Sequence, residues 1–204
     1  MTFKAKMGII ATGLFTTGTM LTALTSALLL TSTASYAKDK DHKDDIMRLA
    51  LQSSETTMTQ AIAAFRSNYA GTIVEIELDD EDHMLVYEIK AINLDAGEKH
   101  QASYTLNNLT EVEYYHKSLK VLGFSKLDDE DVAAIESVNQ PGAVSIDKAI
   151  EIANAHNSSH IESIELEHKR GLTYYEVEYI DGSQMRRLLI DAASGEAIPS
   201  INRK

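Results

Sequence analysis

The sequence predicts an α+β fold in which a helix followed by a small antiparallel sheet occurs twice. At a constant shift of 88 positions, Met58–Ile92 falls on Ile146–Ile180 without a gap. The positions that are identical in the two copies are mostly apolar, as two copies of one packing scheme should be. Each copy opens with apolar residues at helical spacing and continues with strand-like runs separated by turn residues. Helices and antiparallel strands ordered in this way are typical of α+β domains.

The first 37 residues have the layout of a secretory signal peptide. Lys4 and Lys6 precede a run without charge from Met7 to Ser35, and small residues then lead to a cleavage site after Ala37. This predicts a protein of the periplasm or the secreted fraction. The apolar run is longer than in most signals, so the alternative is an uncleaved anchor in the inner membrane formed by residues 7–30.

Charge and composition restrict the classes of partner and the sources of stability. The net charge of −12 becomes −14 when Lys4 and Lys6 leave with residues 1–37. Such an acidic chain repels phosphate backbones and anionic membranes, which argues against nucleic acid as a partner. The chain has no cysteine, so apolar burial must stabilise it. Because a unit of about 60 residues is marginal alone, the two copies are expected to pack together or against a partner.

The first copy spans residues 57–124 and follows a leader at 38–56 that contains a short helix at Asp44–Gln52. Thr57 and Gln60 have the spacing of a capping box and predict a helix start. That helix is expected to end around Asn68–Gly71, where Gly71 can take the left-handed conformation that stops a helix. The acidic run Asp79–Asp82 is expected to form the first turn between strands. The strands expected here are Ile73–Leu78, Met84–Leu94, Gln101–Leu106 and a short return at Thr110–Tyr115.

A linker at residues 125–143 separates the copies, and a helix capped by Asp128 is expected within it as far as Val138. The second copy spans residues 144–204. Ser145 is expected to cap a helix at Ile146–His156. Asp181 and Gly182 form the strongest hairpin signal in the chain. The strands expected in this copy are Ile161–Glu167, Leu172–Ile180, Met185–Asp191 and Glu196–Ile198.

The second copy resembles the PepSY family. The resemblance rests on Tyr175-Glu176-Val177, Asp181-Gly182, Leu189-Ile190-Asp191-Ala192 and Ser194-Gly195-Glu196. The first copy is similar more weakly, since Asn107 and Asn108 replace Asp191 and Ala192, and Thr110 replaces the glycine. The resemblance implies a helix packed on a small antiparallel sheet. It also implies a binding module, because the family occurs in propeptides of secreted metallopeptidases and in regulators of cell-envelope enzymes.

No catalytic residue, metal ligand or cofactor is predicted. His156 and His160 have the spacing of metal ligands on a helix, but Asn157 stands where a zinc peptidase needs glutamate and the helix is expected to end there. The acidic runs Asp79–Asp82 and Asp128–Asp131 lack the spacing of a calcium loop. No Gly-x-Ser-x-Gly elbow occurs.

Four residues are the candidate partner-binding residues. Tyr174 lies on the polar side of its strand, and its counterpart Val86 is also apolar, so both copies are expected to carry an exposed apolar residue on the outer face. Arg186 and Arg187 would meet an acidic partner, or pair with carboxylates of the chain itself.

The sequence therefore predicts an exported, non-catalytic PepSY-like protein that binds a protein partner and regulates or inhibits a peptidase or cell-envelope enzyme. The alternative is an envelope module that binds a small ligand or a divalent cation and feeds a sensor. A third alternative is a purely structural spacer.

Overall fold

The computed structural model describes residues 46–198, apart from residues 48, 83, 122–123, 126 and 181–185. The predicted signal peptide (1–37) and the alternative membrane anchor (7–30) lie outside this part of the chain. Within it, no helix has the length and apolar character needed to cross a bilayer.

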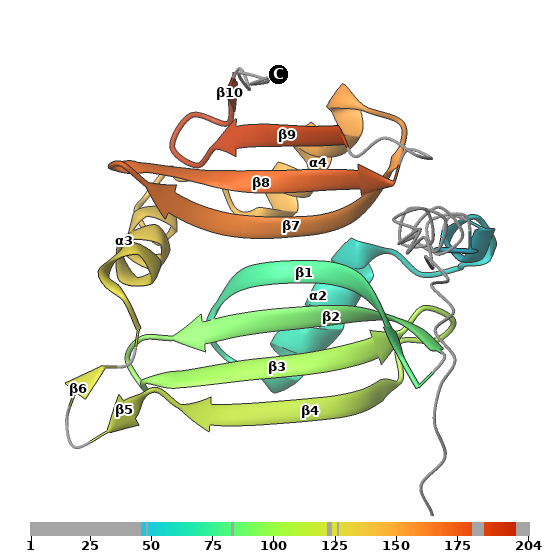
Figure 1. Cartoon of the computed structure of the whole chain (residues 1–204), viewed down its shortest axis with the longest axis horizontal. Helices are drawn as coiled ribbons and strands as arrows, with labels where there is room; N and C mark the ends of the chain where they lie inside the picture. Colours follow the sequence, from blue (N-terminus) through green and yellow to red (C-terminus); the bar gives the residue numbers. More distant parts are fainter. Residues whose placement is uncertain are drawn as a thin grey trace, which may run out of the picture. The chain divides into compact units, whose positions relative to one another are not determined.

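Eight antiparallel strands form one sheet, in the order β10-β9-β8-β7-β1-β2-β3-β4 (Figure 1). These strands are β1 (Thr72–Glu81), β2 (Met84–Asn93), β3 (Glu98–Thr105), β4 (Glu111–Ser118), β7 (His160–Lys169), β8 (Leu172–Ile180), β9 (Arg186–Asp191) and β10 (Ala197–Ile198). A separate hairpin pairs β5 (Lys120–Val121) with β6 (Phe124–Ser125). The helices are α2 (Met58–Asn68), α3 (Asp129–Val138) and α4 (Ile146–His156). The predicted α+β class with two helix-plus-sheet units is confirmed.

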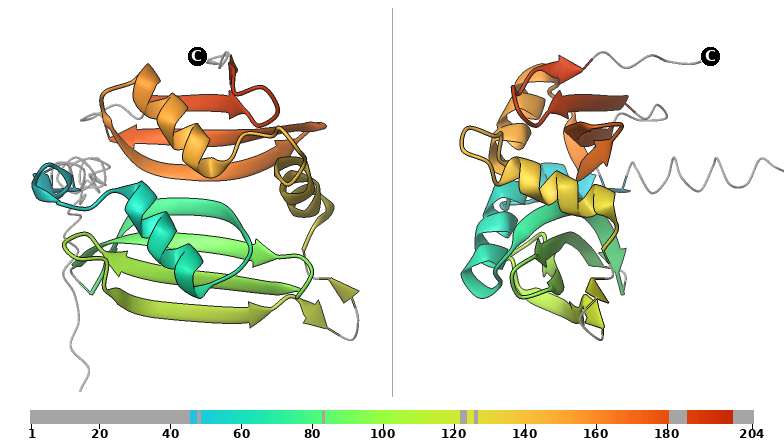
Figure 2. Two further views of the ribbon diagram at one scale, coloured as in Figure 1. Left: turned by 180° about the vertical axis from the view of Figure 1, so that it is seen from behind. Right: turned by 90° about the vertical axis from the view of Figure 1, so that its left-hand side faces the viewer.

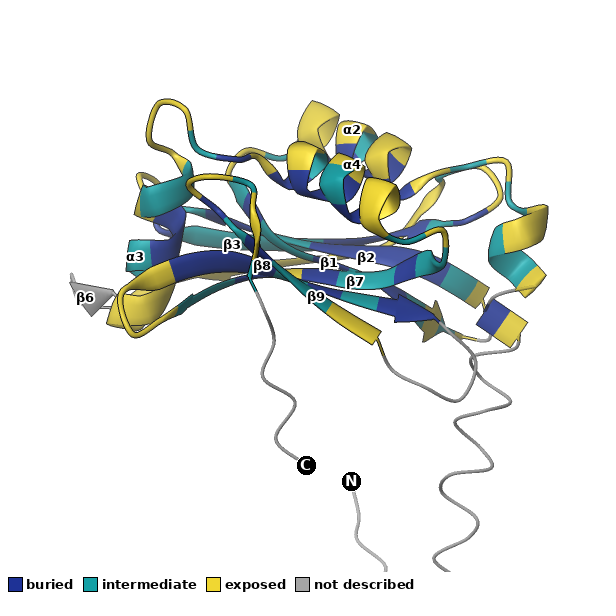
Figure 3. Cartoon of the chain, turned by 90° about the horizontal axis from the view of Figure 1, so that it is seen from above, coloured by how far each residue is buried: buried dark blue, intermediate teal, exposed yellow. Residues whose placement is uncertain are grey.

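Helices α2 and α4 lie side by side on one face of the sheet (Figures 2 and 3). That face carries the main core, in which Ala61, Ile62 and Phe65 of α2 and Ala149 and Ala153 of α4 are almost fully buried. We call this the helix face and the opposite side the outer face. Alternate side chains of each strand point to opposite faces, so the apolar alternation in both copies decides which side meets the helices.

The two copies join through β1 and β7, which pair antiparallel over three residue pairs. Ile76 lies opposite Ile164, and both side chains are fully buried. These two residues are equivalent in the duplication, and the flanking pairs Glu75–Glu165 and Glu77–Ser163 exchange under the same shift. The junction is therefore an internal version of the isologous contact that joins twofold dimers.

The helix starts follow the local chemistry of the sequence. The Thr57 hydroxyl accepts from the Gln60 amide, and the Gln60 side chain accepts from the Thr57 amide, which confirms the capping box. Ser145 caps α4 and Asp128 caps α3, as predicted. The predicted short helix at Asp44–Gln52 is also present, since residues 46–47 and 49–53 are helical.

Helix α3 is the structured part of the predicted linker. It packs against β7 and β8 at one end of the sheet (Figure 2). Its Ile135 side chain is fully buried and forms a small second core with Ile92 and Leu119. The segment between the copies thus adds its own apolar contacts to the folded unit.

Three local predictions in the first copy are right only in part: the extent of the first turn, the length of the return strand and the residue that ends α2. Of the predicted turn Asp79–Asp82, only Asp82 lies in the turn, with φ of 47°. Asp79, Asp80 and Glu81 instead continue β1, paired with Val86, Leu85 and Met84. Pairing with β2 satisfies their backbone groups, and this outweighs the turn preference of aspartate. The return strand is also longer than expected, because β4 extends to Ser118.

The predicted end of α2 around Asn68–Gly71 is confirmed, but Gly71 is not its cap. The helix ends at Asn68, and Tyr69 follows as its cap in an extended conformation. Gly71 has φ of 136°, and a Cβ there would lie 2.9 Å from the backbone carbonyl of Ile92. A glycine is required at this position by the close approach of β2. The Asp181-Gly182 hairpin lies outside the described residues.

The core of the second copy contains a buried tyrosine that should contribute measurably to stability. The Tyr175 hydroxyl donates to the Val144 carbonyl at 2.8 Å. Tyr175→Phe leaves that carbonyl without this donor, and we expect the free energy of unfolding to fall by about 1–3 kcal/mol in urea denaturation. Tyr115→Phe on exposed β4 is the matched control and should change it by less than about 0.5 kcal/mol. Equal effects of the two substitutions would contradict this assignment.

Candidate functional site

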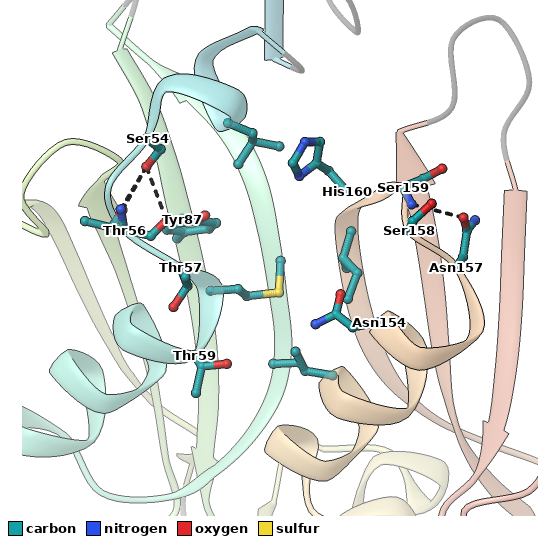
Figure 4. A pocket seen from close by; sticks show the side chains of 14 residues that line it. Ser54, Thr56, Thr57, Thr59, Tyr87, Asn154, Asn157, Ser158, Ser159 and His160 are labelled. Atoms are coloured by element: carbon teal, nitrogen blue, oxygen red, sulfur yellow. Dashed lines mark hydrogen bonds between the residues drawn. The ribbon is translucent and has the colours of Figure 1, made fainter.

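A polar pocket of about 460 Å³ opens on the helix face where the two copies meet (Figure 4). It lies beside the first turn of α2 and the end of α4. Its polar lining side chains are Ser54, Thr56, Thr57, Thr59, Tyr87, Asn154, Asn157, Ser158, Ser159 and His160. Several already have partners within the protein: the Ser54 hydroxyl donates to the Leu106 carbonyl at 2.8 Å, and Asn157 accepts from the Ser159 amide at 3.0 Å.

The chemistry of this pocket is that of neutral hydrogen bonding. Among the described residues that line it, one carries an imidazole, His160, and none carries a carboxylate. Burial raises the pKa of the Tyr87 hydroxyl to about 12, so that group stays protonated at neutral pH. His156 ends α4 and His160 begins β7, so the two imidazoles do not share a helix face, as predicted. The pocket suits amide or hydroxyl groups of a ligand.

The outer face carries an acidic groove of about 330 Å³ across the junction of the two copies. It is lined by Glu75, Glu77, Ser163, Glu165, Glu176, Glu178 and Arg187. The five glutamates and Ser163 alternate along β1, β7 and β8 with the side chains that point into the core, and Arg187 comes from β9. Because the duplication repeats the same parity, it places acids of both copies on one surface.

Each copy supplies a cation that contacts several of these acids. The Lys90 ammonium lies 3.1 Å from a Glu75 oxygen, 3.2 Å from Glu77 and 2.9 Å from Glu88. Arg187 contacts Glu176 at 3.0 Å and Glu178 at 2.5 Å. Burial raises the pKa of Glu77, and the charge of Lys90 opposes that effect. The two cations offset part of the repulsion among the acids.

Strand β4 forms one edge of the eight-stranded sheet, and all eight of its residues are exposed. Val112, Tyr114 and Tyr115 are large apolar side chains on this strand. An exposed edge strand presents unpaired backbone groups on which another chain can pair. The opposite edge is different: β10 has two residues, and Pro199 follows in the sequence. Short strands and proline protect an edge from pairing.

The backbone groups of β4 that point outward can be assigned from one hydrogen bond. The Leu119 amide donates to the Gly97 carbonyl at 2.8 Å, and the register continues through Glu98–Ser118 and His100–His116. Antiparallel pairs alternate between bonded and non-bonded. The amides of Tyr115 and Lys117 therefore face β3, whereas those of Tyr114, His116 and Ser118 face away from the sheet.

The profile of the PepSY family, described as "Peptidase propeptide and YPEB domain", matches residues 57–115 and 143–198, together more than half of the chain. The chain belongs to the PepSY family. The two matched regions coincide with the two helix-and-sheet copies, so the chain carries tandem PepSY repeats.

Two solved structures are similar to this chain, both at low sequence identity. A crystal structure described as that of a candidate lipoprotein from Clostridium difficile 630 is 19% identical, with a TM-score of 0.47, and the match covers 75% of this chain and 97% of that one. The YpmB protein from Bacillus subtilis is 16% identical, with a TM-score of 0.25, and the match covers 71% and 96%. No curated protein matches the chain.

The predicted exposure of Tyr174 and Val86 is wrong. Tyr174 is 8% exposed and Val86 is fully buried. Both lie on the outer face as expected, but their neighbours cover them. Tyr174 sits between Glu167 and Asp191 on the adjacent strands, near the end of the sheet where α3 packs. Contact of these two residues with a partner stays a prediction.

The two arginines lie at the start of β9. Arg187 pairs with carboxylates of the chain itself, the alternative that the sequence left open. Arg186 is exposed and lies opposite Tyr179. A partner-binding role for either arginine stays a prediction. The sequence predicts a strand at Thr110–Tyr115, but neither its extension to Ser118 nor its place at the exposed edge of the sheet, because edge position depends on pairing between distant strands.

Removal of the Lys90 cation should destabilise the outer face. Lys90→Met keeps the length of the side chain but leaves Glu75, Glu77 and the buried Glu88 without it. We expect a loss of about 1–3 kcal/mol in urea denaturation, since partial exposure lowers the cost of breaking a buried ion pair. Arg66→Met, which removes the exposed pair with Asp147, should cost at most about 1 kcal/mol. A larger effect at Arg66 would contradict this ranking.

Glu165 should lower stability at neutral pH, because it lies opposite both Glu75 and Glu176. Burial raises the pKa of Glu165, and Glu167, Glu75 and Glu176 raise it further. A pKa above the unfolded value means that the ionised form opposes folding at higher pH, and that the penalty disappears as pH falls through the raised pKa.

Glu165→Gln should therefore stabilise the protein by at most about 0.5 kcal/mol at pH 7, because Glu165 is exposed and water screens its charge, with a smaller gain on acidification. Thermal melting between pH 4 and pH 8 (roughly the range in which carboxylates titrate) measures both effects. Glu151→Gln is the control and should give no gain, because Glu151 pairs with Lys148 on the exposed side of α4. If the stabilisation by Glu165→Gln instead increased as pH falls, the assigned direction of the Glu165 pKa shift would be wrong.

Proposed function

We propose that this chain is an exported, non-catalytic PepSY protein that binds an extended segment of a protein partner along β4. Through that contact it restrains a peptidase or another cell-envelope enzyme. The observation that carries the proposal is the asymmetry of the sheet: one edge is short and followed by proline, and the other is eight residues long and exposed. Strand addition to an open edge is a common mode of peptide recognition.

The side chains of β4 support a peptide as the added strand. Tyr114 and His116 lie on the helix face of the strand, and Tyr115 and Lys117 lie on the outer face. Tyrosine is enriched at protein interfaces, because its ring buries apolar area while its hydroxyl stays paired. Backbone hydrogen bonds would supply affinity, and these alternating side chains would select the sequence that binds.

Export and restraint of an enzyme rest on other features. The layout of residues 1–37 supports export. The family description, which names peptidase propeptides, supports a peptidase as the restrained enzyme. The described residues that line the helix-face pocket include no carboxylate to pair with the His160 imidazole, which supports a binding role.

A photo-crosslinking experiment in the producing cell tests the contact. A photoreactive phenylalanine at Tyr115 should capture a discrete protein, whereas the same group at Leu172 at the start of β8, which is also exposed, should not. Tyr114→Pro removes an amide that faces away from the sheet, so we expect at least about a tenfold loss of the adduct. Tyr114→Thr removes the same ring but keeps the amide, and should lose clearly less of the adduct than Tyr114→Pro, because the backbone hydrogen bond to the added strand remains.

Melting curves of both Tyr114 variants establish that they are folded. The edge-strand contact would be ruled out if the photoreactive group at Leu172 captured the same proteins. It would also be ruled out if the adduct still formed in a folded Tyr114→Pro variant. If the captured protein is a peptidase, added chain should lower its rate of cleavage. An unchanged rate of cleavage would rule out restraint of the enzyme, but not binding to it.

A further inference from the structure

Three potential metal ligands meet on the helix face of β3 and β4: Glu98, His100 and His116. Their ligand atoms all lie within 4.8 Å of one another. We propose that these residues form a binding site for a divalent transition-metal ion of the zinc class. This goes beyond the proposed function, because the site requires no partner chain.

The register of the hairpin brings the three side chains together. His100 and His116 lie directly opposite each other, and Glu98 precedes His100 by two residues on the same face. Because the Leu119 amide bonds to the Gly97 carbonyl and bonded pairs alternate with non-bonded ones, His100–His116 is a non-hydrogen-bonded pair. In such a pair the two Cα atoms approach to about 4.5 Å. Cross-strand side chains are closest at such pairs. The imidazole rings have their centroids 5.2 Å apart.

The distances suit a tetrahedral ion. The Nε2 atom of His100 lies 3.6 Å from one Glu98 oxygen, and the Nε2 atom of His116 lies 3.5 Å from the other. Two ligand atoms each about 2.0–2.1 Å from zinc, at a tetrahedral angle, are separated by about 3.4 Å. Each imidazole is thus nearly at ligand spacing from one oxygen of Glu98, and small side-chain rotations would bring a single carboxylate oxygen to that spacing from both.

A second set of contacts orients His100. Its Nδ1 atom lies 2.9 Å from the Tyr114 hydroxyl, so Nε2 is the nitrogen that faces Glu98. The Tyr114 ring stacks on Tyr69, with centroids 4.4 Å apart and planes inclined by 6°. The Tyr69 hydroxyl in turn donates to Glu111 at 2.9 Å. When Nδ1–H donates to Tyr114, the lone pair of Nε2 is available to a metal, as in many metal-binding histidines.

The donor set selects the class of ion. Calcium and magnesium take oxygen ligands, whereas imidazole suits zinc, copper and nickel. Three protein ligands leave a fourth position for water, and the partial exposure of Glu98 (39%) and His116 (43%) gives an ion access. The outer-face grouping of Glu77, Asp79 and Glu88 differs, because the Lys90 ammonium already contacts two of its members.

Calorimetric titration of the full chain tests the site after a chelator has removed bound metal. We expect ZnCl₂ to bind at one equivalent, and CaCl₂ or MgCl₂ at the same concentrations to give no saturable heat. His116→Ala removes a ligand and should weaken zinc binding by about a hundredfold or more. Tyr114→Phe removes only the partner of Nδ1 and should weaken it by about tenfold.

The matched control is the double variant His156→Gln/His160→Gln, whose imidazoles have helical metal-ligand spacing but lie on different elements. It should bind zinc within twofold of the parent (roughly the scatter that an unaffected site allows). His116 is exposed on β4, so its alanine variant should melt at the parent temperature in chelator. Absence of one-to-one zinc binding, an unchanged affinity in His116→Ala, or a loss in the control variant would each overturn the site.

Discussion

The pairing of β1 with β7 is the contact on which the rest of the structure depends. One copy of the helix-and-sheet unit has about the size at which a core is marginal. Joining the copies through Ile76 and Ile164 makes one eight-stranded sheet and puts both helices over one core. The junction also covers one edge of each copy, which would otherwise be open to other chains.

The duplication explains why this junction is symmetric. The two central isoleucines are equivalent residues, and irregularities in β1 after Ile73 and in β7 after Ile161 also occur at equivalent positions. When a strand pairs with its own duplicated counterpart, one self-complementary sequence serves both sides of the contact, as in a twofold dimer. The same symmetry brings the acids of both copies together on the outer face, where Lys90 and Arg187 offset them. It leaves β4 of the first copy as the long open edge.

Much of the fold could be predicted from local chemistry, and the parts that could not depend on long-range register. The caps at Thr57, Asp128 and Ser145 involve residues three positions apart, so their side chains alone predict them. Strand parity assigned Tyr174 to the correct face. It contained no information on what covers that face, and the tyrosine proved to be buried.

The candidate sites illustrate the same limit of local patterns. His100 and His116 are sixteen positions apart, and only the pairing of β3 with β4 places them opposite each other. The pair at His156 and His160 has the more suggestive spacing, yet the end of α4 separates it. The junction of β1 with β7 likewise has no local signal, because each strand would look the same if it paired elsewhere.

Hydrogen exchange in increasing denaturant, followed by mass spectrometry, tests most directly whether the two copies are one folding unit. If β1 and β7 join them as described, amides in β2 of the first copy and β8 of the second should become exchangeable with the same free energy and the same dependence on denaturant. Two separate unfolding isotherms, one for each PepSY repeat, would contradict the account.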